Sequence, residues 1–302
     1  MRRWLYGVVA AAAVACSASA FAGDNEQLAY FQAKSISHSG LRGSHTVALT
    51  FDDGPNAATI GVMAALKARN VPATFFVVGR MGKAHPQILQ QIEANGYQLA
   101  NHSATHPLLG KRFDAHPEQL ISQIRIVHDE IAPVMKPGEK FFFRAPYGAW
   151  RAGHAAILNA DPVLRNYIGP IYWDAGGDTE ISKSGYITSS ADWDCWRRGW
   201  TAQKCAKGYL REIRRKNGGV ILMHCINNKA AELVSAVVPA LVEEGYRFVR
   251  IDQIPEYRQY ETPVAPPVAV ARADKPKQRG ASLVAEASVI GGNVMSIAGR
   301  KH

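Results

Sequence analysis

The chain has 302 residues, which is enough for one α/β domain of about 200 to 250 residues with an extension at each end. It contains 35 Lys and Arg against 25 Asp and Glu, and the resulting net charge of +10 favours anionic partners. The sequence contains no recognition element for DNA or RNA, so we expect no nucleic-acid partner.

The N-terminus has the three parts of a signal peptide. Two arginines follow Met1, an apolar stretch covers residues 4–16, and a small-x-small pattern ends at Ala22. The apolar stretch is shorter than the roughly 20 residues of a membrane-spanning helix. We therefore expect cleavage of residues 1–22, a secreted or periplasmic protein, and no stable membrane span in the mature form. Lipid attachment at Cys16 is an alternative, but no branched residue stands three positions before this cysteine.

Strand-like and helix-like segments alternate along the chain. Short apolar runs that indicate strands cover residues 46–51, 73–78, 98–100, 140–144, 167–173, 220–223 and 247–251. Apolar residues recur every three or four positions, as in helices, at residues 56–69, 86–94, 117–134, 152–160, 201–216 and 229–244. This repeated alternation predicts an α/β fold with a parallel sheet.

The alternating segments define one main domain, which we expect at residues 45–260. A short N-terminal segment, residues 23–44, lies between the signal peptide and this domain. After the domain, residues 261–302 combine prolines, small residues and basic residues without a sustained period. This composition predicts a flexible basic tail.

Two adjacent carboxylates, Asp52 and Asp53, stand where the first strand-like run ends in a tight Asp-Asp-Gly-Pro turn. Successive strand residues point to opposite faces, but the turn begins at Gly54, so both carboxylates can reach one cavity in different roles. Taken alone, such a segment is more often an ordinary surface turn. The two carboxylates therefore indicate a functional site only in combination with other residues that lie near them in the fold.

Two histidines, His102 and His106, follow the third strand-like run in the segment Asn-His-Ser-Ala-Thr-His-Pro. Their four-residue spacing brings both imidazoles to one side, although such a pair alone is commonly a surface feature. With one carboxylate they would make a three-ligand site that leaves positions open for water and a substrate oxygen, as catalytic metals require. Strand ends are also where α/β barrels gather catalytic groups.

Four segments, in order, resemble the motifs of the polysaccharide deacetylases with NodB homology, carbohydrate esterase family 4. They are residues 50–55, 102–107, 144–147 and 222–224, and the resemblance spans residues 45–254. It implies a distorted, incomplete (β/α) barrel of about seven parallel strands. It also implies a metal-dependent hydrolase that removes N-acetyl groups from a polysaccharide or oligosaccharide containing N-acetylglucosamine.

The resemblance assigns roles to the two carboxylates and the histidine pair. Asp52 would be the general base, and Asp53 would bind the metal together with His102 and His106. The metal is expected to be Zn²⁺, with Co²⁺ or another divalent ion as alternatives.

Three further residues receive roles from the same resemblance. Arg144 would orient the base, His224 would be the general acid, and the backbone N–H of Tyr147 would stabilise the oxyanion. A separate acid is a chemical requirement of amide cleavage, because an amine leaves poorly unless it is protonated.

The chain departs from the family pattern at two places. The last motif commonly reads His-Asp, whereas His224 is followed by Cys225. The fourth motif should supply an Asp near a Trp that tunes the acid histidine, but an unusual insertion at residues 179–191 interrupts this region. The candidates for that carboxylate are Asp174, Asp178 and Asp192.

The cysteines match an exported protein. Cys195 and Cys205 stand ten residues apart and would close a short loop by a disulfide in an oxidising compartment. We expect Cys225 to be a small buried residue beside the active site, in preference to a metal ligand.

We expect an N-acetylated glycan as substrate, namely chitooligosaccharide, peptidoglycan or poly-N-acetylglucosamine. Aromatic residues that can stack on sugar rings gather near the predicted loops: Tyr147, Trp150, Tyr172, Trp173, Trp193, Trp196 and Trp200. One alternative is an O-acetyl esterase or small-amide hydrolase of the same fold. Another is a relative that binds glycan without catalysis, although retention of both carboxylates and all three histidines argues against it.

Overall fold

The structure, a computed structural model, describes residues 30–36 and 40–260. The predicted signal peptide (1–22) and basic tail (261–302) lie outside the described residues. The chain divides after Val264 into two units, and all of the described residues belong to the first unit. None of the helices in the described ranges is long and apolar enough to cross a membrane.

Within the described ranges, eight parallel strands form two sheets. The larger sheet contains β2 (Thr46–Asp52), β3 (Thr74–Val77), β4 (Gln98–Asn101), β9 (Gly218–His224) and β10 (Arg247–Phe248). The smaller sheet contains β1 (Phe31–Ile36), β6 (Tyr167–Ile171) and β5 (Phe141–Phe142), in that order. Each of the seven predicted strand segments overlaps one of these strands, and β1 is additional. Its sequence, with Gln32 and Lys34 among few apolar residues, lacks the apolar run that identified the others.

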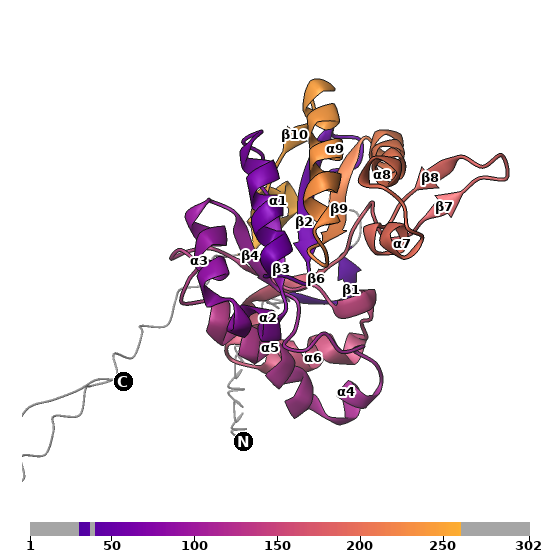
Figure 1. The fold of residues 1–302 in the computed structure, drawn as a ribbon. Helices are drawn as coiled ribbons and strands as arrows, with labels where there is room; N and C mark the ends of the chain where they lie inside the picture. Colours follow the sequence, from indigo (N-terminus) through magenta and orange to yellow (C-terminus); the bar gives the residue numbers. More distant parts are fainter. Residues whose placement is uncertain (1–29, 37–39, 261–302) are drawn as a thin grey trace, which may run out of the picture. The chain divides into compact units, whose positions relative to one another are not determined.

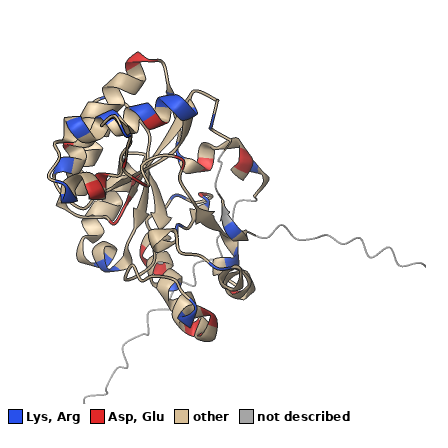
Figure 2. Cartoon of the chain, turned by 90° about the vertical axis from the view of Figure 1, so that its right-hand side faces the viewer, with Lys and Arg blue, Asp and Glu red and all other residues tan. Residues whose placement is uncertain are grey.

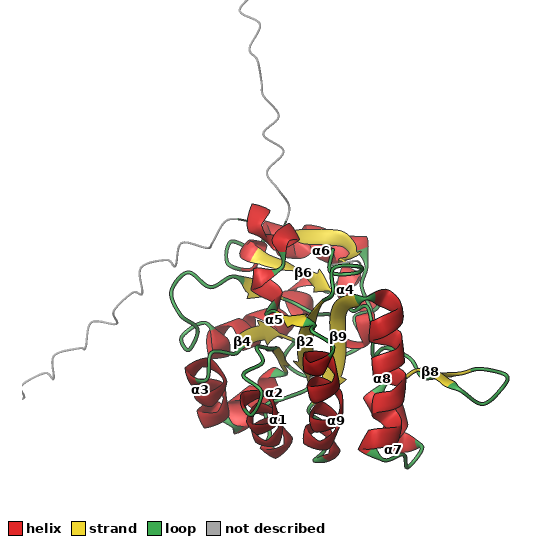
Figure 3. Ribbon diagram, turned by 90° about the horizontal axis from the view of Figure 1, so that it is seen from above, coloured by secondary structure: helices red, strands yellow, loops and turns green. Residues whose placement is uncertain are grey.

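The two sheets are joined into an incomplete barrel. An isolated bridge links Asn101 at the end of β4 to Phe143 after β5, and another links Ala175, after β6, to Ile221 of β9. Figure 3 shows the strands inside and the helices outside this barrel. The predicted α/β architecture of parallel strands in an incomplete barrel is confirmed.

The helices cover the outside of the strands (Figures 1 and 3). They are α1 (Ala57–Lys67), α2 (Gly79–Ala84), α3 (Pro86–Ala94), α4 (Arg112–Ala115), α5 (Pro117–Ile131), α6 (Ala152–Ala160), α7 (Asp192–Arg197), α8 (Ala202–Lys216) and α9 (Lys229–Glu243). The six predicted helices correspond to α1, α3, α5, α6, α8 and α9. The three that were not predicted are only four to six residues long, too short to show a helical period.

Five strands, β2, β3, β4, β6 and β9, are buried on both faces along almost their whole length, which explains their continuous apolar runs. Along β3, Phe75 and Val77 join the apolar cluster beneath α1, α3 and α9, whereas Phe76 joins the cluster inside the barrel. This alternation is the two-residue period of a strand. In β2 the same period places Ala48 inside the barrel, and therefore Thr50 and Asp52 as well.

The first helix starts directly after the Asp52-Asp53 turn because Asn56 caps it. The Asn56 side chain accepts hydrogen bonds from the amides of Ala58 (2.8 Å) and Thr59 (3.4 Å), and the Thr59 hydroxyl accepts one from the Asn56 amide (3.0 Å). Such a reciprocal cap stabilises a helix by about 1 kcal/mol. It also ends the turn that carries the two carboxylates.

The insertion forms an antiparallel hairpin of β7 (Glu180–Ile181) and β8 (Ile187–Ser189). Figure 1 shows it projecting from the barrel beside α8. Arg211 of α8 donates a hydrogen bond to the carbonyl of Ile187, and its guanidinium lies 5.1 Å from the ring of Tyr186. The base of the hairpin is therefore fixed to α8.

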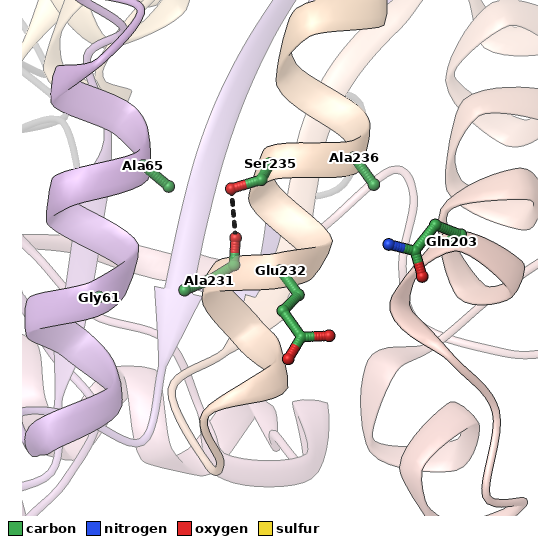
Figure 4. Close-up of a pocket in the computed structure, with 7 residues that line it drawn as sticks. All are labelled: Gly61, Ala65, Gln203, Ala231, Glu232, Ser235 and Ala236. Atoms are coloured by element: carbon green, nitrogen blue, oxygen red, sulfur yellow. Dashed lines mark hydrogen bonds between the residues drawn. The ribbon is translucent and has the colours of Figure 1, made fainter.

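A groove of about 600 Å³ separates α1, α9 and the start of α8 (Figure 4). Its lining residues are Gly61, Ala65, Gln203, Ala231, Glu232, Ser235 and Ala236. Small residues produce this groove: a Cβ on Gly61 would lie only 3.1 Å from the Cβ of Ala231. None of the predicted site residues lines it, so the groove is distinct from the predicted active site.

Candidate active site and metal centre

The predicted site residues meet at the carboxyl ends of the parallel strands. Asp52, the last residue of β2, lies directly opposite His224, the last residue of β9. His102 follows β4, and Arg144 follows the bridge that joins β4 to β5. Because neighbouring parallel strands end at the same edge, segments far apart in the sequence form one site at this edge.

The three predicted metal ligands face one another. Asp53 Oδ1 lies 3.3 Å from His106 Nε2 and 3.7 Å from His102 Nε2. The three potential ligand atoms all lie within 4.8 Å of one another. One carboxylate oxygen and two imidazole nitrogens at such distances form a donor set typical of zinc.

Two further observations fit a cation at this position. His102 Nδ1 lies 2.8 Å from the Arg144 carbonyl oxygen, which requires a proton on Nδ1 and leaves the Nε2 lone pair free toward Asp53. Asp53 Oδ1 is buried and accepts no hydrogen bond from the described residues. A buried carboxylate oxygen without a donor is costly unless a cation balances it.

The loops of the site contain unusual backbone conformations. Asp53, Ser103, His106 and Tyr147 have φ values of 71°, 68°, 58° and 59°, in the left-handed region that non-glycine residues rarely adopt. Local hydrogen bonds hold them: the Ser103 amide donates to Asn101 Oδ1 (2.9 Å), and the His106 amide donates to the Ser103 hydroxyl (3.2 Å). Strain of this kind concentrates at functional sites.

Asp52 is held by a buried arginine. The Arg144 side chain donates to Asp52 Oδ1 at 2.7 Å, and its guanidinium lies 4.1 Å from the centre of the Phe76 ring. Burial alone would raise the pKa of Asp52, but the charges of Arg144, His102 and His224 outweigh it and lower the pKa below its usual value. Asp52 is therefore ionised at neutral pH. Its other oxygen, Oδ2, lies 3.5 Å from His102 Nε2, beside the predicted metal ligands.

Asp192 is the carboxylate that contacts His224, the predicted acid. Asp192 Oδ1 lies 2.7 Å from His224 Nδ1, and Asp192 Oδ2 accepts a 2.7 Å hydrogen bond from the His224 backbone amide. Asp174 instead accepts hydrogen bonds from Arg42 and from the Val220 amide, and Asp178 is exposed. Of the three candidates, Asp192 alone is in contact with His224 in the described residues.

The Asp192 contact determines the proton affinity of His224. Burial alone would lower the pKa of the imidazole, but the charge and hydrogen bond of Asp192, with smaller contributions from Asp52 and Asp53, raise it to about 9. At neutral pH the ring is therefore protonated, with Nδ1 engaged by Asp192 and Nε2 left to carry a transferable proton.

Two structural features hold Asp192 in place. The predicted disulfide between Cys195 and Cys205 is present and connects α7 to α8. Tyr209, which the sequence did not single out, accepts a hydrogen bond from the Asp192 amide (3.1 Å) and donates one to the Leu222 carbonyl (3.0 Å). Tyr209 has no local sequence signal, because only the packing of α8 on β9 brings its hydroxyl there.

Cys225 is a buried free thiol, as predicted. Burial raises the pKa of the thiol to about 12, while a hydrogen bond with Thr59 acts in the opposite direction. A Cβ added to Gly54 would lie 3.5 Å from the Cys225 Cβ, so the side chain faces the start of α1. Its backbone contacts the site, because its amide donates to the Asp52 carbonyl at 2.8 Å.

Tyr147 lies beside the histidine pair, in the short 3-10 turn Pro146–Gly148. Its ring is 66% exposed and contacts the His106 ring edge to face, with 4.6 Å between centroids. No described residue accepts a backbone hydrogen bond from its amide. An amide without a backbone acceptor is what the oxyanion role predicted for Tyr147 requires.

Comparison with known proteins identifies the class to which this fold and site belong. Residues 40–163 match the profile of the polysaccharide deacetylases. A chitooligosaccharide deacetylase of Azorhizobium caulinodans is 30% identical over 220 residues, which cover 67% of this chain and 90% of that protein. The chain belongs to the polysaccharide deacetylase family.

A second relative is considerably longer. The peptidoglycan-N-acetylglucosamine deacetylase PgdA of Listeria monocytogenes is 30% identical over 213 residues, 69% of this chain. The chain spans only 38% of the length of that protein.

Solved structures share the fold. PdaA of Bacillus subtilis, a family 4 carbohydrate esterase, superposes with a TM-score of 0.55 at 22% identity, covering 72% of this chain and 85% of that one. A family 4 protein of Bacillus anthracis described as a pseudoenzyme superposes with a TM-score of 0.54 at 22% identity, covering 70% of this chain and 65% of that one. Catalysis must therefore be argued from the site, since the fold alone does not establish it.

Proposed function

We propose that this protein is a metal-dependent deacetylase that removes N-acetyl groups from a glycan containing N-acetylglucosamine. One observation carries the proposal. An ionised carboxylate, Asp52, and a protonated imidazole, His224, lie at the ends of adjacent strands, next to the ligand cluster of Asp53, His102 and His106. Groups whose environments move their pKa values in opposite directions are suited to be base and acid in one reaction.

Asp53, His102 and His106 would hold a divalent cation, for which zinc is the simplest choice from the donor set. When bound, such an ion polarises the carbonyl of the acetamide and lowers the pKa of a water molecule. The protein's own side chains and one backbone amide carry out the proton transfers and stabilise the developing charge.

Asp52 accepts the proton of the attacking water, and Arg144 keeps its carboxylate ionised and fixed in direction. The amide of Tyr147 donates a hydrogen bond to the oxygen that gains negative charge. His224 then transfers its proton to the departing amine, supported by Asp192, which stabilises the charged ring before the transfer.

The relatives support a glycan substrate in a bacterial envelope. Their names include chitooligosaccharide deacetylases, a peptidoglycan-N-acetylglucosamine deacetylase and peptidoglycan-N-acetylmuramic acid deacetylases. We infer an N-acetylated glycan as substrate for this chain and, with the signal-peptide pattern at residues 1–22, a secreted or periplasmic location.

Acetate release tests the proposal. The purified protein is incubated with chitooligosaccharides, peptidoglycan and acetylated xylan, before and after removal of metal by a chelator and with Zn²⁺ or Co²⁺ restored. We expect release from at least one N-acetylated glycan, loss with the chelator and recovery with metal. Release from xylan alone would indicate an O-acetyl esterase, and glycan binding without any release would indicate a non-catalytic relative.

A further inference from the structure

The solvent-facing side of α8 is almost entirely basic. Its exposed side chains are Gln203, Lys204, Lys207, Arg211, Arg214 and Arg215, and its acidic residue, Glu212, is buried. These cations recur every three or four residues, so they follow one line along the helix with a spacing of about 5.4 Å per turn. Figure 2 shows this side of the molecule with Lys and Arg in blue.

Three of these cations are not neutralised by the protein. Arg214 is paired with Glu244, and Arg215 lies 3.9 Å from Glu212. Lys204, Lys207 and Arg211 form no ion pair with any described residue. We call these three residues the basic row. They occupy successive turns of α8, so their positive charges add along one line.

Two members of the basic row are held in place by aromatic rings. Lys204 Nζ lies 4.3 Å from the centre of the Trp200 ring. Arg211 lies over Tyr186 of the hairpin and also donates to the Ile187 carbonyl. Side chains that are already ordered lose less conformational entropy when they bind a ligand. The insertion therefore helps to form this surface.

The basic row begins next to the catalytic edge. Asp192, which contacts His224, is the first residue of α7, and the Cys195–Cys205 disulfide ties α7 to the first turns of α8. Trp193, the residue after Asp192, is 43% exposed. The surface next to the acid histidine thus continues through α7 onto α8.

We propose that the basic row binds an anionic glycan whose chain carries carboxylate or phosphate groups beside its acetylated sugars. This inference rests on the proposed function, because it states which glycans the site would receive. Charge complementarity supports it, since three unpaired cations in a line fit a chain with repeated negative groups. A lipid surface fits less well, because no exposed residue of α8 is apolar and interfacial helices insert an apolar face.

The test compares two variants that each lose three positive charges. One changes the basic row, Lys204→Gln, Lys207→Gln and Arg211→Gln, and glutamine preserves helix propensity. The matched control carries Lys67→Gln, Arg69→Gln and Arg258→Gln, at exposed positions outside the site and outside α8. A third variant with Lys204→Arg, Lys207→Arg and Arg211→Lys keeps every charge and checks for damage to the helix.

Binding to polygalacturonate, which carries carboxylates but no acetamide, is measured at increasing salt. We expect the wild type, the control and the charge-preserving variant to bind, and the basic-row variant to bind at least roughly tenfold more weakly. On an acidic N-acetylated polymer such as peptidoglycan, KM should rise in the basic-row variant only. On neutral chitooligosaccharides all four proteins should have the same kcat/KM.

Equal weakening in the basic-row variant and the control would overturn the proposal, as would binding to phosphatidylglycerol vesicles or duplex DNA but not to polygalacturonate.

The experiments distinguish failure of the deacetylase assignment from failure of the basic-row proposal. If the wild type releases no acetate from any glycan, the deacetylase assignment fails, while the polygalacturonate measurement still decides whether the basic row recognises an anionic glycan.

Discussion

At the scale of single residues, the pairing of Asp192 with His224 determines how activity should depend on pH. The pKa of His224 is raised to about 9, and in the proposed mechanism His224 is the general acid, which must be protonated to act. Activity should therefore fall as the pH rises through the pKa of His224. In the Asp192→Asn variant burial would dominate and lower the pKa, so the alkaline limb should move at least roughly one unit toward lower pH.

The profile of kcat/KM against pH checks this expectation in wild type and Asp192→Asn. The effect on stability has the same origin. A raised pKa means that the ion pair stabilises the fold fully below the ordinary His value of about 6.5, and that this stabilisation is lost as the pH rises toward 9. An unchanged alkaline limb in the variant would show that His224 is not the group that titrates there.

Substitutions of Asp52 and of His106 should have different effects on the amount of bound zinc. Asp52→Asn cannot accept a proton, so activity should fall at least roughly a hundredfold while zinc content, measured by elemental analysis, stays near normal. His106→Ala removes a ligand and should lose both zinc and activity while remaining folded. Full zinc in His106→Ala, or zinc loss in Asp52→Asn, would reverse the two assignments.

Residues within contiguous motifs could be predicted from the sequence, and residues brought in by packing could not. Asp53, His102 and His106 lie in short segments after strands, so these segments together indicated a cation site, and the family resemblance assigned Asp53 to it. Asp192 remained one of three candidates because the insertion that forms the β7–β8 hairpin separates it from the rest of the motif region. Tyr209 was missed altogether, since a tyrosine in the middle of a helix is usually an ordinary core residue.

At the scale of secondary-structure elements, α7 depends on its disulfide. It has six residues, too few for a stable isolated helix, and it presents Asp192 to the acid histidine. Replacing Cys195 and Cys205 together by Ala should lower the free energy of unfolding by about 2–4 kcal/mol. It should also shift the alkaline limb of the pH profile toward that of Asp192→Asn.

Denaturant unfolding and the pH profile measure these two effects. Cys225→Ala is the matched control, because it removes a buried thiol and leaves the disulfide intact. If the double variant is less stable but keeps the wild-type pH profile, the disulfide stabilises the fold without positioning Asp192.

At the scale of the whole molecule, β1 was not predicted from the sequence although it is an integral part of the fold. Its Phe31 is 1% exposed, and the Phe31 amide donates to Asn159 of α6 at 3.0 Å. Apolar runs identified the other seven strands, most of which are buried on both faces. β1 lies at the edge of the smaller sheet, where polar residues are tolerated, so its sequence carries a weaker signal.

A chain that starts at residue 45 should therefore be less stable than one that starts at residue 23. Loss of the Phe31 side chain alone should cost about 3 kcal/mol or more, and the edge of β6 would be left unpaired. Thermal unfolding of the two chains tests this. Phe31→Ala in the longer chain separates the contribution of the side chain from that of the strand, and equal melting temperatures throughout would show that β1 is dispensable.

The pairing of β2 with β9 has a consequence for how the protein opens. These strands are paired over seven residues, from Thr46 opposite Gly218 to Asp52 opposite His224, and β2 also pairs with β3 and β10 on its other side. Their amides should exchange with solvent only when the whole domain unfolds, whereas the loop carrying His106 can open locally. We therefore expect the proposed base and acid, Asp52 and His224, to keep a fixed separation when the loop that carries His106 opens locally.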